Sequence, residues 1–127
     1  MNDIEFARTI SPRIGTLYGE AKGCHTELPA HALNCLRGTC HLLCDLLAEH
    51  GGVAFPVTGD LDRKIYLLFS HDVVDSETRE RLTQLRVNGN KGAHPEKFFQ
   101  AHSDFLALAD QSLGSTCVLL EMAHRRL

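Results

Sequence analysis

The fold is decided by one stretch, residues 29–52, "PAHALNCLRGTCHLLCDLLAEHGG". Its apolar side chains recur at intervals of three and four residues, at Leu33, Leu36, Cys40, Leu43 and Leu47. This spacing places them on one face of an α-helix. Pro29 suits the first turn of a helix, where a backbone N–H is not needed, and the Gly51-Gly52 pair is typical of a helix end. The stretch therefore predicts one long amphipathic helix.

The residues before this stretch predict a shorter helix over residues 12–22. Ser11 is a good N-terminal cap, because its side-chain oxygen can accept a bond from a free backbone N–H, and Pro12 follows at the first helical position. Gly23 is a plausible end for this helix. Residues 3–9 allow an additional turn of helix upstream.

Residues 61–69, "LDRKIYLLF", fit two kinds of element. The apolar run within them suits a buried strand, whereas Leu61, Ile65 and Leu68 fit the spacing of a helix. Because the rest of the chain offers no second strand for pairing, we expect a helix, which Asp60 would cap.

Two further helices complete the predicted architecture. The first covers residues 77–87, is capped by Asp75 or Ser76, and ends at residues 88–90, "NGN". The second covers residues 103–125. Its apolar side chains again recur every three or four residues, at Leu106, Ala109, Leu113, Cys117 and Leu120. The pattern as a whole predicts an all-α fold, a compact bundle of four to five helices.

The composition is that of an ordinary globular protein, with 43% hydrophobic and 23% charged residues. The net charge of −3 gives no global field that would attract nucleic acid or an anionic membrane, although a local basic patch is compatible with it. No apolar run is long enough for a transmembrane helix, and the polar, acidic N-terminus is not a signal peptide. Five cysteines, three of them within one predicted helix, indicate reduced thiols and a cytoplasmic protein.

Cysteines and histidines crowd into residues 24–44: Cys24, His25, Cys35, Cys40, His41 and Cys44. Thiolates and imidazoles are ligands that zinc prefers, so a zinc-binding regulator is one hypothesis for this segment. The segment lacks a Cys-x-x-Cys knuckle, however, and Cys40 falls in the apolar stripe. Because free cysteines are commonly buried, we expect core cysteines, no metal ligand and no cofactor.

The strongest candidate for a polar site is residues 85–99, "LRVNGNKGAHPEKFF". A glycine-rich segment with several hydrogen-bonding side chains predicts a compact turn between two helices, in which Asn90 caps exposed backbone groups. The alternative is a binding site, in which Arg86, Lys91 and His94 converge on a phosphate and His94 serves as acid or base.

Residues 61–94 resemble the core of a bacterial family, domain of unknown function 4145. The family signature is a helix ending in Leu-Arg, followed by Gly-Asn and then by Ala-His. The corresponding residues here are Leu85-Arg86, Gly89-Asn90 and Ala93-His94. Arg37 matches an upstream arginine of the family, and His41 stands where the family commonly has a glutamate. The resemblance covers about residues 28–120 of a single predicted domain, residues 1–127.

This family is similar to the HEPN group of α-helical domains, many of which are dimeric RNases. In those nucleases an arginine and a histidine at a short spacing act on the phosphodiester without a metal. The seven residues between Arg86 and His94 exceed that spacing, and Val87 replaces a residue that is often polar. We therefore expect an HEPN-like, non-catalytic module that forms a homodimer or serves as an accessory protein. It would act with a protein or RNA partner in phage defence or nucleic-acid metabolism. We expect no association with a membrane.

The same resemblance implies an alternative, a metal-independent endoribonuclease of the toxin or defence type. In that case Arg86 and His94 are the catalytic residues. The other motif positions would then have structural roles: Arg37, His41, Gly89, Asn90, Lys91 and Ala93.

Overall fold

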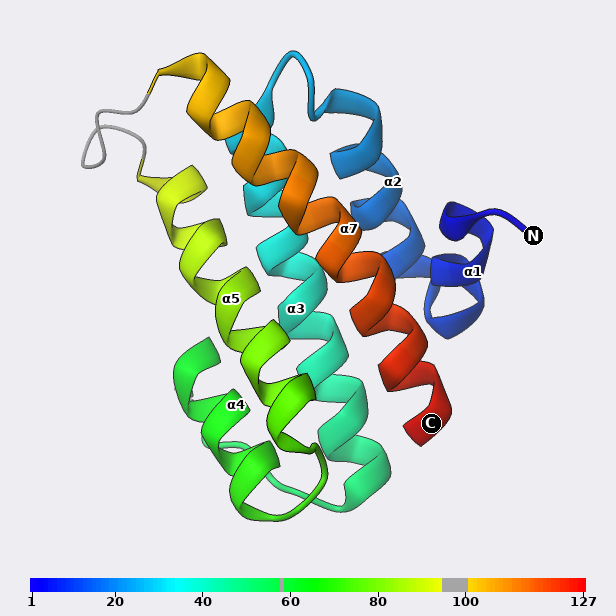
Figure 1. The fold of residues 1–127 in the computed structure, drawn as a ribbon. Coiled ribbons are helices and arrows are strands. Elements are labelled where there is room, and N and C mark those ends of the chain that lie inside the picture. The colour runs from blue at the N-terminus through cyan, green and yellow to red at the C-terminus, as the bar shows by residue number, and fades with distance from the viewer. Residues whose placement is uncertain (58, 95–100) are drawn as a thin grey trace.

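The computed structural model describes residues 1–57, 59–94 and 101–127, and in these ranges the protein is all-α (Figure 1). Six helices are present there: α1 (Asp3–Ile10), α2 (Pro12–Cys24), α3 (Pro29–Gly51), α4 (Leu61–Ser70), α5 (Ser76–Ala93) and α7 (His102–Arg126). The predicted all-α class is confirmed. The described ranges contain more helices than the four to five predicted, because residues 3–10 form a separate helix rather than an extra turn.

Ser11 separates α1 from α2 because its backbone is extended, at φ −161° and ψ 137°. Its N–H bonds back to the last turn of α1 at 3.2 Å, and its Oγ accepts from the Ile14 N–H, which caps α2. Asp3 then ties the two helices together, because it accepts hydrogen bonds from Lys22 and from the Tyr18 hydroxyl, each at 2.7 Å. The bond from Lys22, helped by that from Tyr18, lowers the pKa of Asp3 below its ordinary value.

The other helix ends follow local signals in the sequence. Gly52 closes α3 in the left-handed conformation, at φ 71°, which favours glycine. Asp60 caps α4 by accepting from a backbone N–H at 2.9 Å, so the helical alternative for residues 61–69 is confirmed. Asp75, rather than Ser76, caps α5 in the same way.

α3 is the central helix of the bundle (Figure 1). α5 lies antiparallel along one side of it and α4 packs against both, while α2 and α7 cover the rest of α3 and α1 packs on α2. Side chains between these helices form one core, whose largest fully buried apolar members are Tyr18, Ile14, Leu33, Leu36, Leu43, Leu47, Leu68, Leu82, Leu85, Leu119 and Leu120. No described helix combines the length and the hydropathy needed to cross a membrane.

Three of the five cysteines are core residues, as expected: Cys35, Cys40 and Cys44. Cys40 and Cys44 are fully buried on α3, and Cys40 Sγ lies 3.6 Å from the Leu82 carbonyl oxygen. A hydrogen bond with Cys40, together with burial, holds the pKa of the Cys44 thiol well above its ordinary value. The Cys44 thiol is therefore uncharged at neutral pH. All five cysteines carry free thiols.

α5 differs from the prediction at its C-terminal end. The sequence predicts a helix end at residues 88–90 and a compact turn after it, but α5 continues to Ala93. The prediction is wrong because Gly89 and Gly92 serve the packing of two helices rather than a turn. Neither glycine has the positive φ that a turn would require. The part of the predicted stretch after residue 94 lies outside the described residues.

Candidate functional site

Gly89 and Gly92 allow α5 to approach α3 closely. A Cβ atom at Gly89 would lie 2.5 Å from Arg37 Cβ. One at Gly92 would lie 2.7 Å from both the Ala30 carbonyl oxygen and Leu33 Cβ. These separations are well inside van der Waals contact, so only glycine fits without a shift. We call this contact, formed by these five residues, the α3–α5 seam.

Two arginines lie in or near the α3–α5 seam: Arg37 belongs to it, and Arg86 lies three residues before Gly89 on α5. Arg37 packs its aliphatic chain over Gly89, and Arg86 Nε lies 3.7 Å from Asp62 Oδ1 on α4. The second distance allows an ion pair but not a hydrogen bond. Within the described ranges, the buried Nε atoms of both arginines have no hydrogen-bond acceptor. Arg37 in the seam and Arg86 beside it therefore each have a buried Nε that the described residues leave without an acceptor.

His41 lies one turn after Arg37 on α3 and is half-buried. Burial lowers its pKa below the ordinary value, and the positive charges of Lys64 and Arg37 add to this effect, while Asp45 opposes it. Lys64 reaches α3 from α4 and donates to Asp45 Oδ1 at 2.8 Å. At neutral pH the His41 imidazole is therefore uncharged and adds no positive charge to the arginine pair.

Arg86 and His94 lie at different positions along the axis of α5. The His94 backbone N–H donates to the Asn90 carbonyl oxygen at 3.1 Å, and the residue caps the helix in an exposed position. Because the intervening residues are helical, eight steps separate the two Cα atoms by about 12 Å along the axis and turn them by about 80°. One copy of α5 therefore presents the two side chains on different faces, two turns apart.

The remaining motif residues lie on different sides of α5. Lys91 faces α7, where it lines a shallow surface hollow with Asp104 and Leu108. Ala93 is the last residue of the helix. The Asn90 amide makes no hydrogen bond to any residue in the described ranges, so the capping bond predicted for a turn is not found among them.

Asn88 lies between the motif residues and carries a buried amide, and the sequence pattern did not single it out. Its Nδ2 donates to Ser112 Oγ on α7 at 3.1 Å, and both side chains are buried. A signal for it exists in the sequence. Once the helix continues past residue 87, Asn88 falls three residues after Leu85 and four before Gly92, which places it on the buried side.

The surface between α4 and α5 is open and partly apolar. A hollow of about 740 Å³ is lined there by residues of both helices and of the loop before α4, among them Tyr66 and Thr83. Tyr66 is 56% exposed, and Val87, one turn after Thr83 on α5, is 39% exposed. We refer to Tyr66, Thr83 and Val87 as the α4–α5 face.

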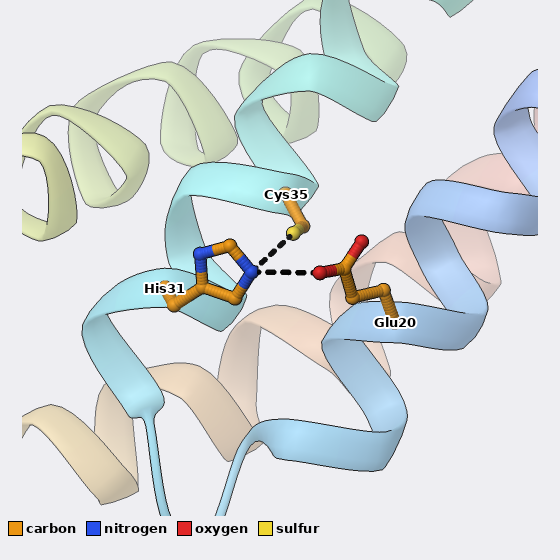
Figure 2. A group of neighbouring side chains, drawn as sticks. All are labelled: Glu20, His31 and Cys35. Carbon is orange, nitrogen blue, oxygen red and sulfur yellow. Dashed lines mark hydrogen bonds and ion pairs between the residues drawn. The ribbon is translucent and has the colours of Figure 1, made fainter.

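A separate cluster of potential metal ligands joins α2 to α3, away from the α3–α5 seam. Glu20 of α2 lies beside His31 and Cys35, which are one turn apart on α3 (Figure 2). Burial, followed by the charges of Glu20 and Cys24, raises the pKa of the Cys35 thiol to about 11. The Cys35 thiol is therefore protonated at neutral pH, and it lies beside the imidazole ring of His31 and the side-chain oxygens of Glu20.

The family comparison covers all of these features. The profile of the family described as Domain of unknown function (DUF4145) matches residues 20–124. The chain belongs to this family. No curated protein and no solved structure matches it. The DUF4145 match begins at Glu20 and ends within α7, so it is longer than the resemblance over residues 28–120. It contains both the α3–α5 seam and the cluster on α2 and α3.

Proposed function

We propose that this DUF4145 protein is an HEPN-like, non-catalytic helical module that works by association in the cytoplasm. It would act as a homodimer or as an accessory partner in phage defence or nucleic-acid metabolism. The observation that carries the proposal is the packing of the helix segment that contains the family motif. Gly89 of the motif and the nearby Gly92 fit against α3, and Asn88, between the motif residues, bonds to α7. Residues engaged in this way stabilise a scaffold, whereas a nuclease needs an arginine and a histidine that meet at one phosphate.

The α4–α5 face is the surface that we assign to self-association. Exposed aromatic and aliphatic side chains beside a hollow commonly mark protein contacts, and tyrosine is enriched at the centres of interfaces. Arg79 also lines the hollow, and its guanidinium lies 4.4 Å from the centroid of the Phe69 ring, which gives the face a polar edge. A second copy is the partner we propose, since the HEPN group commonly forms dimers.

The wild-type protein is expected to be a dimer, and Tyr66→Glu combined with Val87→Glu is expected to convert it to a monomer. Each substitution replaces an apolar contact with a carboxylate that would lose its hydration at the interface. In a two-fold dimer the penalty applies twice, because the same patch is used by both copies. Light scattering coupled to size-exclusion chromatography, over a wide range of concentrations, measures the change.

Val118→Glu is the matched control for this experiment. Val118 lies on α7 and is 38% exposed, about as much as Val87, but it is not part of the α4–α5 face. The control variant should remain dimeric, and circular dichroism should show that all variants are folded. A wild-type protein that stays monomeric at the highest concentration contradicts self-association.

A metal-independent endoribonuclease is the second candidate. It is favoured by the guanidinium groups of Arg37 and Arg86, whose buried Nε atoms lack acceptors within the described ranges. Arginine is suited to the bidentate binding of a phosphodiester. In this candidate Arg86 binds the phosphate and His94 transfers the proton. Because the two residues are about 12 Å apart along one helix, a dimer would have to bring them together from different copies.

RNA cleavage in the presence of EDTA tests this second candidate. If Arg86 and His94 act on the phosphodiester, His94→Ala should lower the cleavage rate by about 100-fold or more, the usual contribution of an acid or base, without a change in Tm. His71→Ala removes a different exposed histidine and should leave the rate unchanged. Absence of cleavage at high protein concentration contradicts the nuclease and leaves the association proposal standing.

A further inference from the structure

Three potential metal ligands converge on the surface between α2 and α3. Figure 2 shows the His31 imidazole directed at both the Glu20 carboxylate and the Cys35 thiol. His31 Nε2 lies 2.9 Å from Glu20 Oε1 and 3.6 Å from Cys35 Sγ, and the three ligand atoms lie within 4.8 Å of one another. The Nε2 of a neutral imidazole cannot donate to the carboxylate and accept from the thiol at the same time. A cation between the three atoms would satisfy all of them.

The chemistry of these donors fits zinc(II). Zinc binds thiolate sulfur at about 2.3 Å, imidazole nitrogen at about 2.0–2.1 Å and carboxylate oxygen at about 2.0–2.2 Å. Tetrahedral bonds of these lengths place sulfur and nitrogen about 3.5 Å apart. The observed separation of Cys35 Sγ and His31 Nε2 is 3.6 Å. The Glu20 oxygen needs to withdraw from Nε2 by about 0.4 Å and to lie about 3.6 Å from Cys35 Sγ. The three ligand atoms now lie within 4.8 Å of one another, and an exposed carboxylate can make this adjustment by rotation.

The hairpin formed by α2 and α3 holds the ligands in place. His31 and Cys35 are four residues apart and share one face of α3, and Glu20 is presented by α2, which packs on that helix. Cys35 is 6% exposed and forms the floor of the cluster. The side chains of Glu20 and His31 are 51% and 47% exposed, which leaves a path for an ion from solvent. This arrangement matches a zinc site with three protein ligands and an open fourth position.

We propose that Glu20, His31 and Cys35 bind one zinc ion, with water in the fourth position. On binding, the Cys35 thiol releases its proton to solvent and a zinc–sulfur bond forms in its place. The ion would cross-link α2 to α3 and thereby stabilise the folded state. The site is independent of the proposed association, because it does not include the α4–α5 face.

Zinc titration of the reduced protein tests the proposal. Competition against a chromophoric chelator should give one tight zinc ion per chain, and saturation with zinc should raise Tm. Cobalt(II) in place of zinc should give the near-ultraviolet absorption of a thiolate-to-metal charge transfer, which histidines elsewhere in the chain cannot produce. Glu20→Gln and His31→Ala should each weaken zinc binding at least about 10-fold and reduce the zinc-dependent rise in Tm.

The controls separate this site from other thiols and imidazoles. Cys35→Ser should abolish the thiolate band, whereas Cys117→Ser and His71→Ala, which lie elsewhere in the fold, should bind metal like the wild type. If Cys35→Ser does not fold, the Glu20 and His31 variants still decide the question. Cobalt binding without a thiolate band, or unchanged zinc affinity in those two variants, overturns the proposal.

Discussion

Gly92→Ala is expected to lower the Tm of the protein by several degrees. The added Cβ would lie 2.7 Å from the Ala30 carbonyl oxygen and 2.7 Å from Leu33 Cβ, both of which are fixed to the α3 backbone. Neither atom can rotate away, so α5 must shift outward and lose contacts along the seam. Overpacking of this kind typically costs about 1–3 kcal/mol, a large part of the about 5–15 kcal/mol that stabilises a domain. Thermal unfolding followed by circular dichroism measures the change.

Gly114→Ala is the matched control for this substitution. Gly114 also lies inside a helix, α7, but it is exposed, and no atom lies within 4 Å of an added Cβ. Because alanine favours a helix over glycine by about 1 kcal/mol, this variant should be more stable than the wild type. Gly89→Ala should be destabilised like Gly92→Ala, since its Cβ would meet Arg37 Cβ at 2.5 Å. Equal Tm values for Gly92→Ala and Gly114→Ala would contradict the close approach of α3 and α5.

The helix ends that could be predicted from the sequence have local chemical causes. Ser11 and Asp60 each offer a side-chain oxygen to a backbone N–H three residues later, and Gly52 adopts a backbone that other residues avoid. These causes act within one turn of chain, so a short window of sequence contains all the information needed. The all-α class followed from the same local patterns and from the apolar stripe of residues 29–52.

α5 shows where local signals fail. Two glycines three residues apart cost a helix about 1 kcal/mol each, which is why the sequence predicts an end at residues 88–90. The compensating term is contact with α3, whose residues 30–37 lie more than 50 positions earlier in the chain. No local pattern contains that contact. The tertiary packing of Gly89 and Gly92 therefore decides the conformation of a segment whose own propensity opposes it.

The metal cluster could be predicted in part, for a related reason. Crowding of cysteine and histidine in residues 24–44 points to possible ligands, and His31 falls in that range without having been singled out. Glu20 lies before it, on another helix, and its place beside Cys35 depends on how α2 packs against α3. The relative position of two helices is set by the packing of the whole core and not by the spacing of ligands along the chain. The spacing placed Cys40 in the apolar stripe, but it gave no sign that Cys35, which is also buried, lies beside a carboxylate of α2.

Asn88→Ala is expected to destabilise the protein clearly more than Asn90→Ala, although the two residues are close neighbours on α5. Asn88 is 5% exposed and donates to Ser112 Oγ at 3.1 Å, so its removal leaves a buried hydroxyl without that partner and a gap between α5 and α7. The expected loss is about 1–3 kcal/mol. Asn90 makes no hydrogen bond to the described residues, and alanine is the better helix former, so its replacement should be close to neutral.

A double-mutant cycle with Ser112→Ala tests whether the Asn88 bond is the cause. Once Ser112 has lost its hydroxyl, Asn88→Ala removes no hydrogen bond. The double variant should therefore lose less unfolding free energy than the sum of the losses in the two single variants. Urea denaturation gives the free energy of unfolding for each variant. Additive losses would mean that Asn88 acts by its volume alone. A larger loss of unfolding free energy for Asn90→Ala than for Asn88→Ala would contradict the packing described for α5. It would place the stabilising amide at position 90, on the side of α5 that faces away from Ser112.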